Sequence, residues 1–335
     1  MPIPPPVIRQ GGGALDYGNF ITSSTNIQKT AIHKISIESG SLFEYIGKTE
    51  VPGRLLNEFS MDEHSDRFTV ATTSESQSYN GFSLQNNVYR FDGKMSIVGK
   101  LEGIAEGESI YAARFMGDKL YLVTFRQTDP FFVIDLSTDQ PQVIGKLKLP
   151  GYSNYLHPYD DSHVIGIGRE GPEFENNNQG IKLALFDVSD LSNPKAVDTY
   201  IIGSSPQTDS EALRDHKALL FNKDKDVLSI PIYSNDGYYG YQGGGNFGRN
   251  VDPLSRVPAP WSGFYVFGLS PENGFKLKGT IQHNEKGNTG IGMFEGSRSF
   301  FIKDTLYTVT SGLLKINNLK DVEKEITTIQ LNGRS

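Results

Sequence analysis

Polar side chains recur just before, or early in, several short apolar runs of the chain. The set consists of Glu58, Tyr111, Arg114, Tyr155, His157, Asp215, His216 and Arg298. These residue types supply metal ligands, titratable groups and fixed positive charge, from which a metal site, an acid/base pair or an anion pocket is built. If the fold gathers these positions, we expect them to form a ligand-binding site.

Within this set, His157, His216 and Asp215 are the candidate metal ligands. In the alternative interpretation, each imidazole is hydrogen-bonded to the backbone or to a carboxylate. The chain has no HExxH motif and no cysteine, which excludes thiolate ligands, disulfides and thiol nucleophiles. We therefore expect no cofactor.

Two segments resemble calcium-binding loops in composition. They are HPYDDSH (157–163) and NKDKD (222–226), which combine carboxylates with Asn or His. Neither has the DxDxDG spacing of an EF-hand loop. Ordinary turns between strands are the expected structure, and a structural calcium ion is the alternative.

Arg126 and Asp129 flank a turn in the stretch FRQTDPF. They could bind a polar ligand at the same end of the fold as the residues above. The alternative is that the two side chains pair with each other within the loop.

The segment 234–262 is long, rich in Tyr and Gly, and ends near the single tryptophan, Trp261. Loops of this length in compact domains are usually functional or disordered. Tyr238, Tyr239, Tyr241 and Trp261 could form a contact surface for a protein or a carbohydrate. In the alternative interpretation Trp261 packs against its own strands.

The composition and the absence of certain motifs argue against several classes of function. The 335 residues include 32 Lys and Arg against 39 Asp and Glu, a net charge of −7, without a basic stripe, so nucleic acid is not an expected partner. No apolar run reaches the length of a membrane-spanning helix, and the N-terminus lacks the pattern of a secretory signal. The sequence also has no GxSxG motif and no P-loop.

A repeated unit predicts which elements position the polar residues. Residues 109–151 contain four short apolar runs separated by turn residues and no helical pattern, and similar units recur along the chain. Four-stranded units repeated without helices are typical of a β-propeller, whose blades surround a channel. We predict an all-β propeller with blades at about 30–52, 54–103, 108–151, 152–203, 210–284 and 296–332. Because the innermost strand of each blade lines the channel, the polar residues should converge at one mouth.

The first blade is incomplete in this prediction. Residues 30–52 supply only its two outer strands, which leaves five clear blades and one partial or irregular N-terminal blade. Either the Pro- and Gly-rich residues 1–29 provide the inner strands, giving six blades, or the chain is the later part of a larger ring. The second alternative is favoured here, and it predicts association through an unpaired blade edge.

Long strings of the sequence resemble a family of archaeal and bacterial secreted proteins with a C-terminal β-propeller domain distantly related to WD-40 repeats. The strings are TAIHKISI, NEFSMDE, RFMGDKLYLVTFRQTDPFFVIDL, YLHPYDDSHVIGIGRE, LALFDVSDLSNPK, EALRDHKALLF and PWSGFYVF. The resemblance implies a propeller that is exported to the cell surface. The chain departs from the family in having no export signal and in starting where members would already have passed several blades.

These observations lead to two hypotheses for function. The first is an extracellular or cell-surface binding or scaffold module without turnover, whose partner is a protein or a carbohydrate. The alternative is a metal-assisted hydrolase or lyase with its site at the mouth of the channel.

Overall fold

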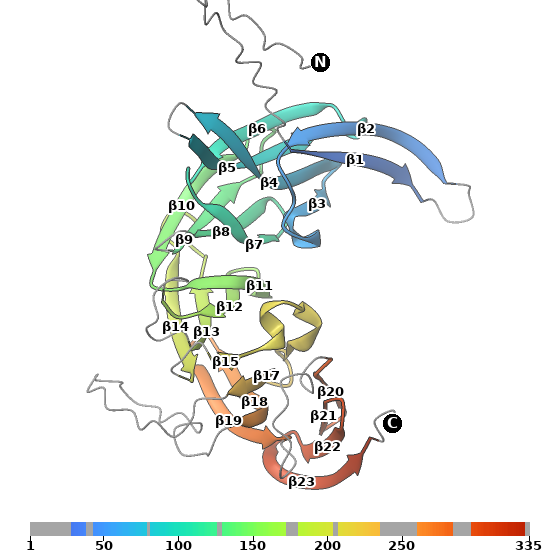
Figure 1. The fold of residues 1–335 in the computed structure, drawn as a ribbon, viewed down its shortest axis with the longest axis vertical. Helices are drawn as coiled ribbons and strands as arrows, with labels where there is room; N and C mark the ends of the chain where they lie inside the picture. The colour runs from blue at the N-terminus through green and yellow to red at the C-terminus, as the bar shows by residue number, and fades with distance from the viewer. Residues whose placement is uncertain are drawn as a thin grey trace, which may run out of the picture.

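The computed structural model describes residues 28–37, 43–78, 81–125, 129–171, 180–203, 207–234, 260–283 and 296–331. These residues form five antiparallel sheets of four or more strands and one of two strands. Figure 1 shows the sheets following one another in chain order along a C-shaped arc. The predicted all-β propeller is confirmed. No helix among the described residues is long and apolar enough to cross a membrane.

The strands of each sheet are consecutive in the chain. The two-stranded sheet contains β1 (Lys29–Ser36) and β2 (Glu44–Pro52). The next contains β3 (Met61–His64), β4 (Arg67–Ser78), β5 (Gly81–Phe91) and β6 (Ile97–Ile104). It is followed by β7 (Ser109–Phe115), β8 (Lys119–Phe125), β9 (Asp129–Asp135) and β10 (Gln142–Leu149). The fourth contains β11 (Tyr152–Asp160), β12 (His163–Arg169), β13 (Ile181–Asp187) and β14 (Lys195–Ile202).

The fifth sheet departs from this pattern at its innermost position. Two short strands, β15 (Thr208–Asp209) and β16 (Leu220–Asn222), both pair with β17 (Val227–Ser234). Outside them lie β18 (Trp261–Ser270) and β19 (Gly274–Gln282). The sixth sheet is regular, with β20 (Arg298–Ile302), β21 (Thr305–Val309), β22 (Leu313–Asn318) and β23 (Asp321–Gln330).

Two 3-10 helices, η2 (Glu211–Leu213) and η3 (His216–Ala218), separate β15 from β16. Each is fixed by a side chain at its start, because Ser210 accepts from the N–H of Ala212 at 3.2 Å and Asp215 accepts from the N–H of Lys217 at 2.9 Å. The repeat predicted a regular four-stranded blade over about 210–284. Instead, these local hydrogen bonds compete with the ladder and interrupt it.

Apolar side chains between neighbouring sheets form the core. Sheets inside the arc are covered on both faces by their neighbours, so the residues of a middle strand such as β13 are buried almost continuously. Across the boundary between the β7–β10 and β11–β14 sheets, the rings of Phe131 and Phe186 stack with centroids 4.7 Å apart. Similar clusters join each of the other neighbouring pairs.

In the described part of the chain, the first blade consists of two strands, as expected for its outer pair. Strands β1 and β2 pair with each other, and one face of this sheet packs through Ile32 and Val51 onto Val70, Tyr89 and Phe91. Residues 1–27, expected as candidates for its inner strands, lie outside the described residues. Figure 1 places β1–β2 and β20–β23 at opposite ends of the arc.

Candidate functional site

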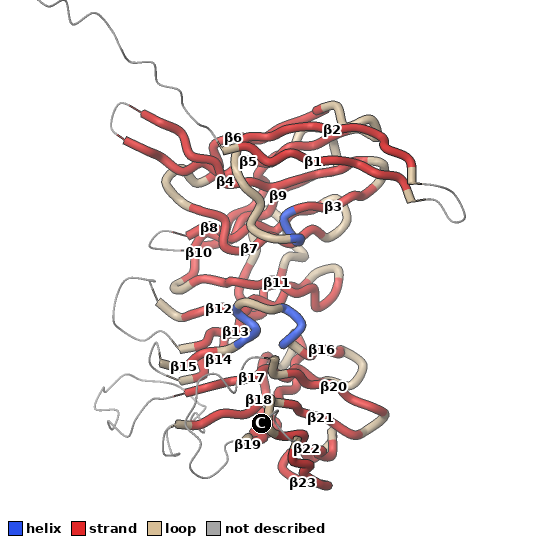
Figure 2. The backbone as a smooth tube through the Cα atoms, turned by 45° about the vertical axis from the view of Figure 1, so that its right-hand side comes forward, coloured by secondary structure: helices blue, strands red, loops and turns tan. Residues whose placement is uncertain are grey.

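A small cavity lies where three segments from different sheets meet. Figure 2 shows the short helices beside β3 and β11. The cavity has a volume of about 90 Å³, whereas sites that enclose a whole small molecule occupy roughly 300 to 1,000 Å³. Its lining consists of Asn57, Glu58, Phe59, Asn154, Tyr155, Ala212, Leu213, Arg214 and His216. A cavity of this size accommodates a single side chain or functional group.

The helix η1 (Glu58–Ser60) presents two of the lining residues. Asn57 begins it by accepting a hydrogen bond from the N–H of Phe59 at 3.0 Å, which satisfies a donor at the helix start. The ring of Phe59 lies edge-on to His216, with centroids 4.8 Å apart, and 5.5 Å from Tyr155. The guanidinium of Arg114 lies 4.8 Å from the centre of the same ring, a cation–π contact.

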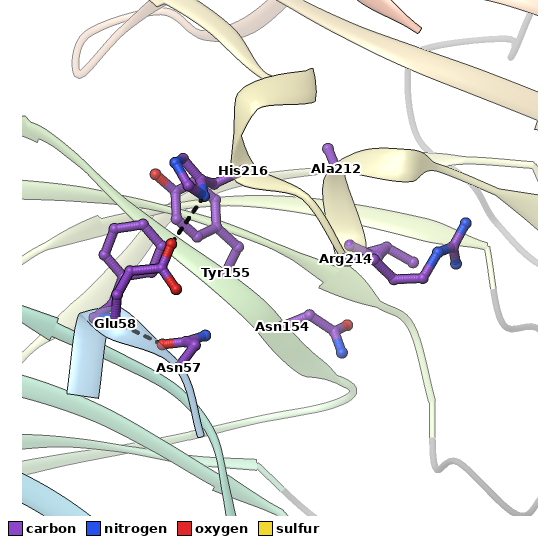
Figure 3. Close-up of a pocket in the computed structure, with 9 residues that line it drawn as sticks. Asn57, Glu58, Asn154, Tyr155, Ala212, Arg214 and His216 are labelled. Carbon is purple, nitrogen blue, oxygen red and sulfur yellow. Dashed lines mark hydrogen bonds and ion pairs between the residues drawn. The ribbon is translucent and has the colours of Figure 1, made fainter. Parts of the chain in front are cut away.

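Glu58 and His216 face one another at the cavity (Figure 3). A carboxylate oxygen of Glu58 lies 3.6 Å from Nδ1 of His216, and the side chains are 61% and 33% exposed. Solvated pairs of this kind stabilise a fold by less than about 1 kcal/mol. The pair therefore contributes polarity at the cavity more than it contributes stability.

His157 contacts Tyr155 and is mostly buried. Its Nδ1 is 3.0 Å from the hydroxyl of Tyr155, and its ring lies edge-on to Phe221 at 5.4 Å. Burial, followed by the positive charges of Arg114 and His216, lowers the pKa of His157 to about 4. Burial also raises the pKa of Tyr155. Both groups are therefore neutral at pH 7.

Arg298 and Asp215 belong to a separate ion-pair network. The carboxylate of Glu211 accepts hydrogen bonds from the N–H groups of Gly296 and Ser297 at 3.0 and 2.9 Å, and from Arg298 at 2.9 Å. Arg298 also donates to Asp215. This network connects the η2–η3 segment to β20.

The predicted metal ligands do not form a cluster in the part of the chain that the structure describes. No three His, Cys, Asp or Glu side chains there are close enough to hold a metal ion together. The rings of His157 and His216 each contact Tyr155, with centroids 5.9 and 6.0 Å from that of Tyr155. Asp215 is bonded to Arg298.

The two calcium-like segments contact each other. Asp160 accepts from Lys223 and from Nδ1 of His163, both at 2.8 Å. Burial opposes ionisation of Asp160, but the hydrogen bonds from Lys223, His163 and the N–H of Ser162 lower its pKa to about 2. The structure thus provides this carboxylate with hydrogen-bond partners from the protein itself.

The remaining predicted site residues lie elsewhere. Tyr111 packs edge-on against Phe125 and Tyr152, and Trp261 is 4% exposed and lies edge-on to Tyr265. Asp129 is described only as the first residue of β9. Other predicted residues fall outside the described residues: Arg126, Tyr238, Tyr239 and Tyr241.

Sequence reasoning missed several lining residues, among them Phe59, Asn154 and Arg214. Phe59 is apolar and was not sought among polar groups, although it contacts the rings of both Tyr155 and His216. Asn154 directly precedes Tyr155, and Arg214 stands between the two short helices. Asn154 could have been identified from the sequence because it is adjacent to Tyr155, a predicted site residue.

Comparisons with known proteins agree with this architecture. A family model described as "Beta propeller domain" matches residues 17–322. An uncharacterized protein of Archaeoglobus fulgidus is 40% identical over 247 residues, which cover 73% of this chain and 36% of that protein. An uncharacterized protein of Methanocaldococcus jannaschii is 40% identical over 224 residues, which cover 66% of this chain and 33% of that protein. The chain thus spans about a third of the length of these relatives.

Proposed function

The chain belongs to the beta propeller domain family, and from that premise we propose that it is a binding module without turnover. Its binding site is the cavity between η1, β11 and the η2–η3 segment. The ligand is a protein, one side chain of which enters the cavity. A location at the cell surface belongs to the same proposal.

The composition of the cavity lining supports this function. Phe59 and Tyr155 provide aromatic surface, and Glu58 and His216 provide polar groups. Aromatic surface surrounded by polar groups is typical of positions that contribute strongly to protein interfaces. The volume of about 90 Å³ favours one anchoring side chain of a larger partner over an enclosed metabolite or sugar.

The environment of His157 favours binding over the alternative, a hydrolase or lyase. A general base must reach its substrate within hydrogen-bond distance. His157 uses Nδ1 for the Tyr155 hydroxyl, and its ring is covered by Phe221. His216, the imidazole at the cavity, faces Glu58 at 3.6 Å and packs on Phe59.

Selection from a random-peptide display library tests the proposal. Peptides that bind the wild-type protein should bind Glu58→Ala and Arg214→Ala at least about tenfold more weakly, because both side chains line the cavity. Val143→Lys is the matched control, since Val143 is exposed on an outer strand away from the site. Equal binding to all variants, with the fold intact by circular dichroism, would contradict the proposal.

A further inference from the structure

Within the described part of the chain, the last sheet of the arc, β20–β23, has an apolar face that no other element covers. Phe300, Ile302 and Ile329 are 43%, 55% and 45% exposed. Phe300 is the register partner of Tyr307, which in turn pairs with Ile316. The rings of Phe300 and Tyr307 are parallel, with centroids 4.9 Å apart. Since neighbouring register partners point to the same side of a sheet, these side chains form one continuous surface.

The opposite face of the same sheet is covered. Phe301 and Leu306, which alternate with the exposed residues, pack against Val227 and Val266 of the preceding sheet. The exposed face therefore corresponds to the surface that each sheet within the arc turns toward its next neighbour. Exposed apolar surface of this kind marks an interaction site.

The β1–β2 sheet, at the other end of the arc, also has an exposed face with apolar side chains. Ile35 and Tyr45 are register partners and are 53% and 57% exposed. The hydroxyl of Tyr45 lies 3.3 Å from Nδ1 of His33. Ile32 and Val51 belong to the covered side of this sheet. Among the described residues, one chain thus carries two sheet faces that no other described element covers, at opposite ends of a C-shaped arc (Figure 1).

We propose that a second copy of this chain covers both faces. The β20–β23 face of each copy packs on the β1–β2 face of its partner, so that two arcs enclose a common channel. A twofold axis makes the two contacts equivalent and closes the assembly, whereas a straight molecule with the same two faces would form a filament. The contact continues the sheet-on-sheet packing seen at each boundary within the arc. The proposed dimer contact does not depend on the ligand site proposed above.

Sedimentation equilibrium over a range of protein concentrations tests the proposal. The wild-type protein should approach twice its chain mass of 37.1 kDa, and the double variant Phe300→Lys/Ile302→Lys should remain at the single-chain mass. The matched control is Ile97→Lys, because Ile97 is 50% exposed but lies on β6. That variant should dimerise like the wild type. A wild-type protein that stays monomeric or forms open-ended polymers would overturn the proposal.

Disulfide trapping tests which faces meet. The chain has no cysteine, so Phe300→Cys and Tyr45→Cys introduce unique thiols. Under mild oxidation a mixture of these two variants should yield a cross-linked heterodimer, and a mixture of Phe300→Cys with Ile97→Cys should not. Cross-linking of Phe300→Cys only with itself would overturn the head-to-tail arrangement. So would co-purification of a different polypeptide that binds the wild type but not the double lysine variant.

Discussion

The carboxylate of Glu58 lies 3.6 Å from Nδ1 of His216, although the two residues belong to short helices that flank different sheets. Glu58 precedes β3, and His216 lies between β15 and β16, with the β7–β10 and β11–β14 sheets between them in the chain. The curvature of the arc brings them together. The cavity is therefore sensitive to how the sheets pack on one another.

The first prediction concerns His283, which is 5% exposed and lies between two threonines. Its Nε2 is 2.8 Å from the hydroxyl of Thr308, and its Nδ1 is 3.2 Å from that of Thr310. Burial lowers the pKa of His283 to about 4. The folded state therefore favours the neutral ring. Above about pH 6.5 the ring is neutral in both the folded and the unfolded state, and its titration does not reduce the free energy of unfolding. As the pH falls from about 6.5 toward about 4, only the unfolded state binds the proton, and the free energy of unfolding decreases by about 3 kcal/mol.

Urea unfolding across this pH range measures the effect. The free energy of unfolding of His283→Gln should fall less steeply with decreasing pH than that of the wild type. His33→Gln is the control, since His33 is exposed on β1. Identical pH profiles for the wild type and His283→Gln would show that the buried ring does not contribute to the pH dependence.

The second prediction concerns the charge beside His157. Arg114 lowers the pKa of His157, although burial is the larger cause. Arg114→Gln should therefore raise the pKa of His157 while leaving it below the ordinary value. NMR titration of the imidazole resonances provides the measurement. Arg214→Gln serves as the control, and an equal change in both variants would contradict the assignment to Arg114.

The third prediction concerns Glu211, whose side chain is 15% exposed. Replacing it with Ala leaves the N–H groups of Gly296 and Ser297 and the guanidinium of Arg298 without this acceptor. The free energy of unfolding should fall by about 2 kcal/mol. Lys100→Ala breaks an exposed pair with Glu102 and should cost less than about 0.5 kcal/mol. Equal costs in chemical denaturation would argue against a structural role for Glu211.

The fourth prediction concerns Trp261. Because this side chain is 4% exposed and packs against Tyr265, Trp261→Ala should reduce the free energy of unfolding by about 3 to 5 kcal/mol. Trp261→Phe should retain most of the stability and bind the selected peptides as the wild type does. Loss of peptide binding in a stable Trp261→Phe variant would instead support the predicted contact surface.

The propeller could be predicted from sequence because its strands recur with similar turns, and that signal is local. The convergence of Glu58, Tyr155 and His216 also followed from their positions before or within inner strands. The contacts of Phe59 could not be predicted, because they depend on the packing of sheets that are distant in sequence. The helices η1, η2 and η3 contain three residues each, too few for a periodic pattern.

The stacking of sheets along the arc also has a mechanical consequence. Within each sheet, backbone hydrogen bonds join the strands, whereas side-chain clusters hold most of each boundary between sheets. Since each sheet contacts mainly its neighbours, as in other repeat architectures, tension applied to the two ends loads these boundaries in series. The arc should therefore yield first by sliding at the boundary around Val51 and Val70, whose apolar cluster is the smallest among the described residues, while the individual sheets remain intact under the load.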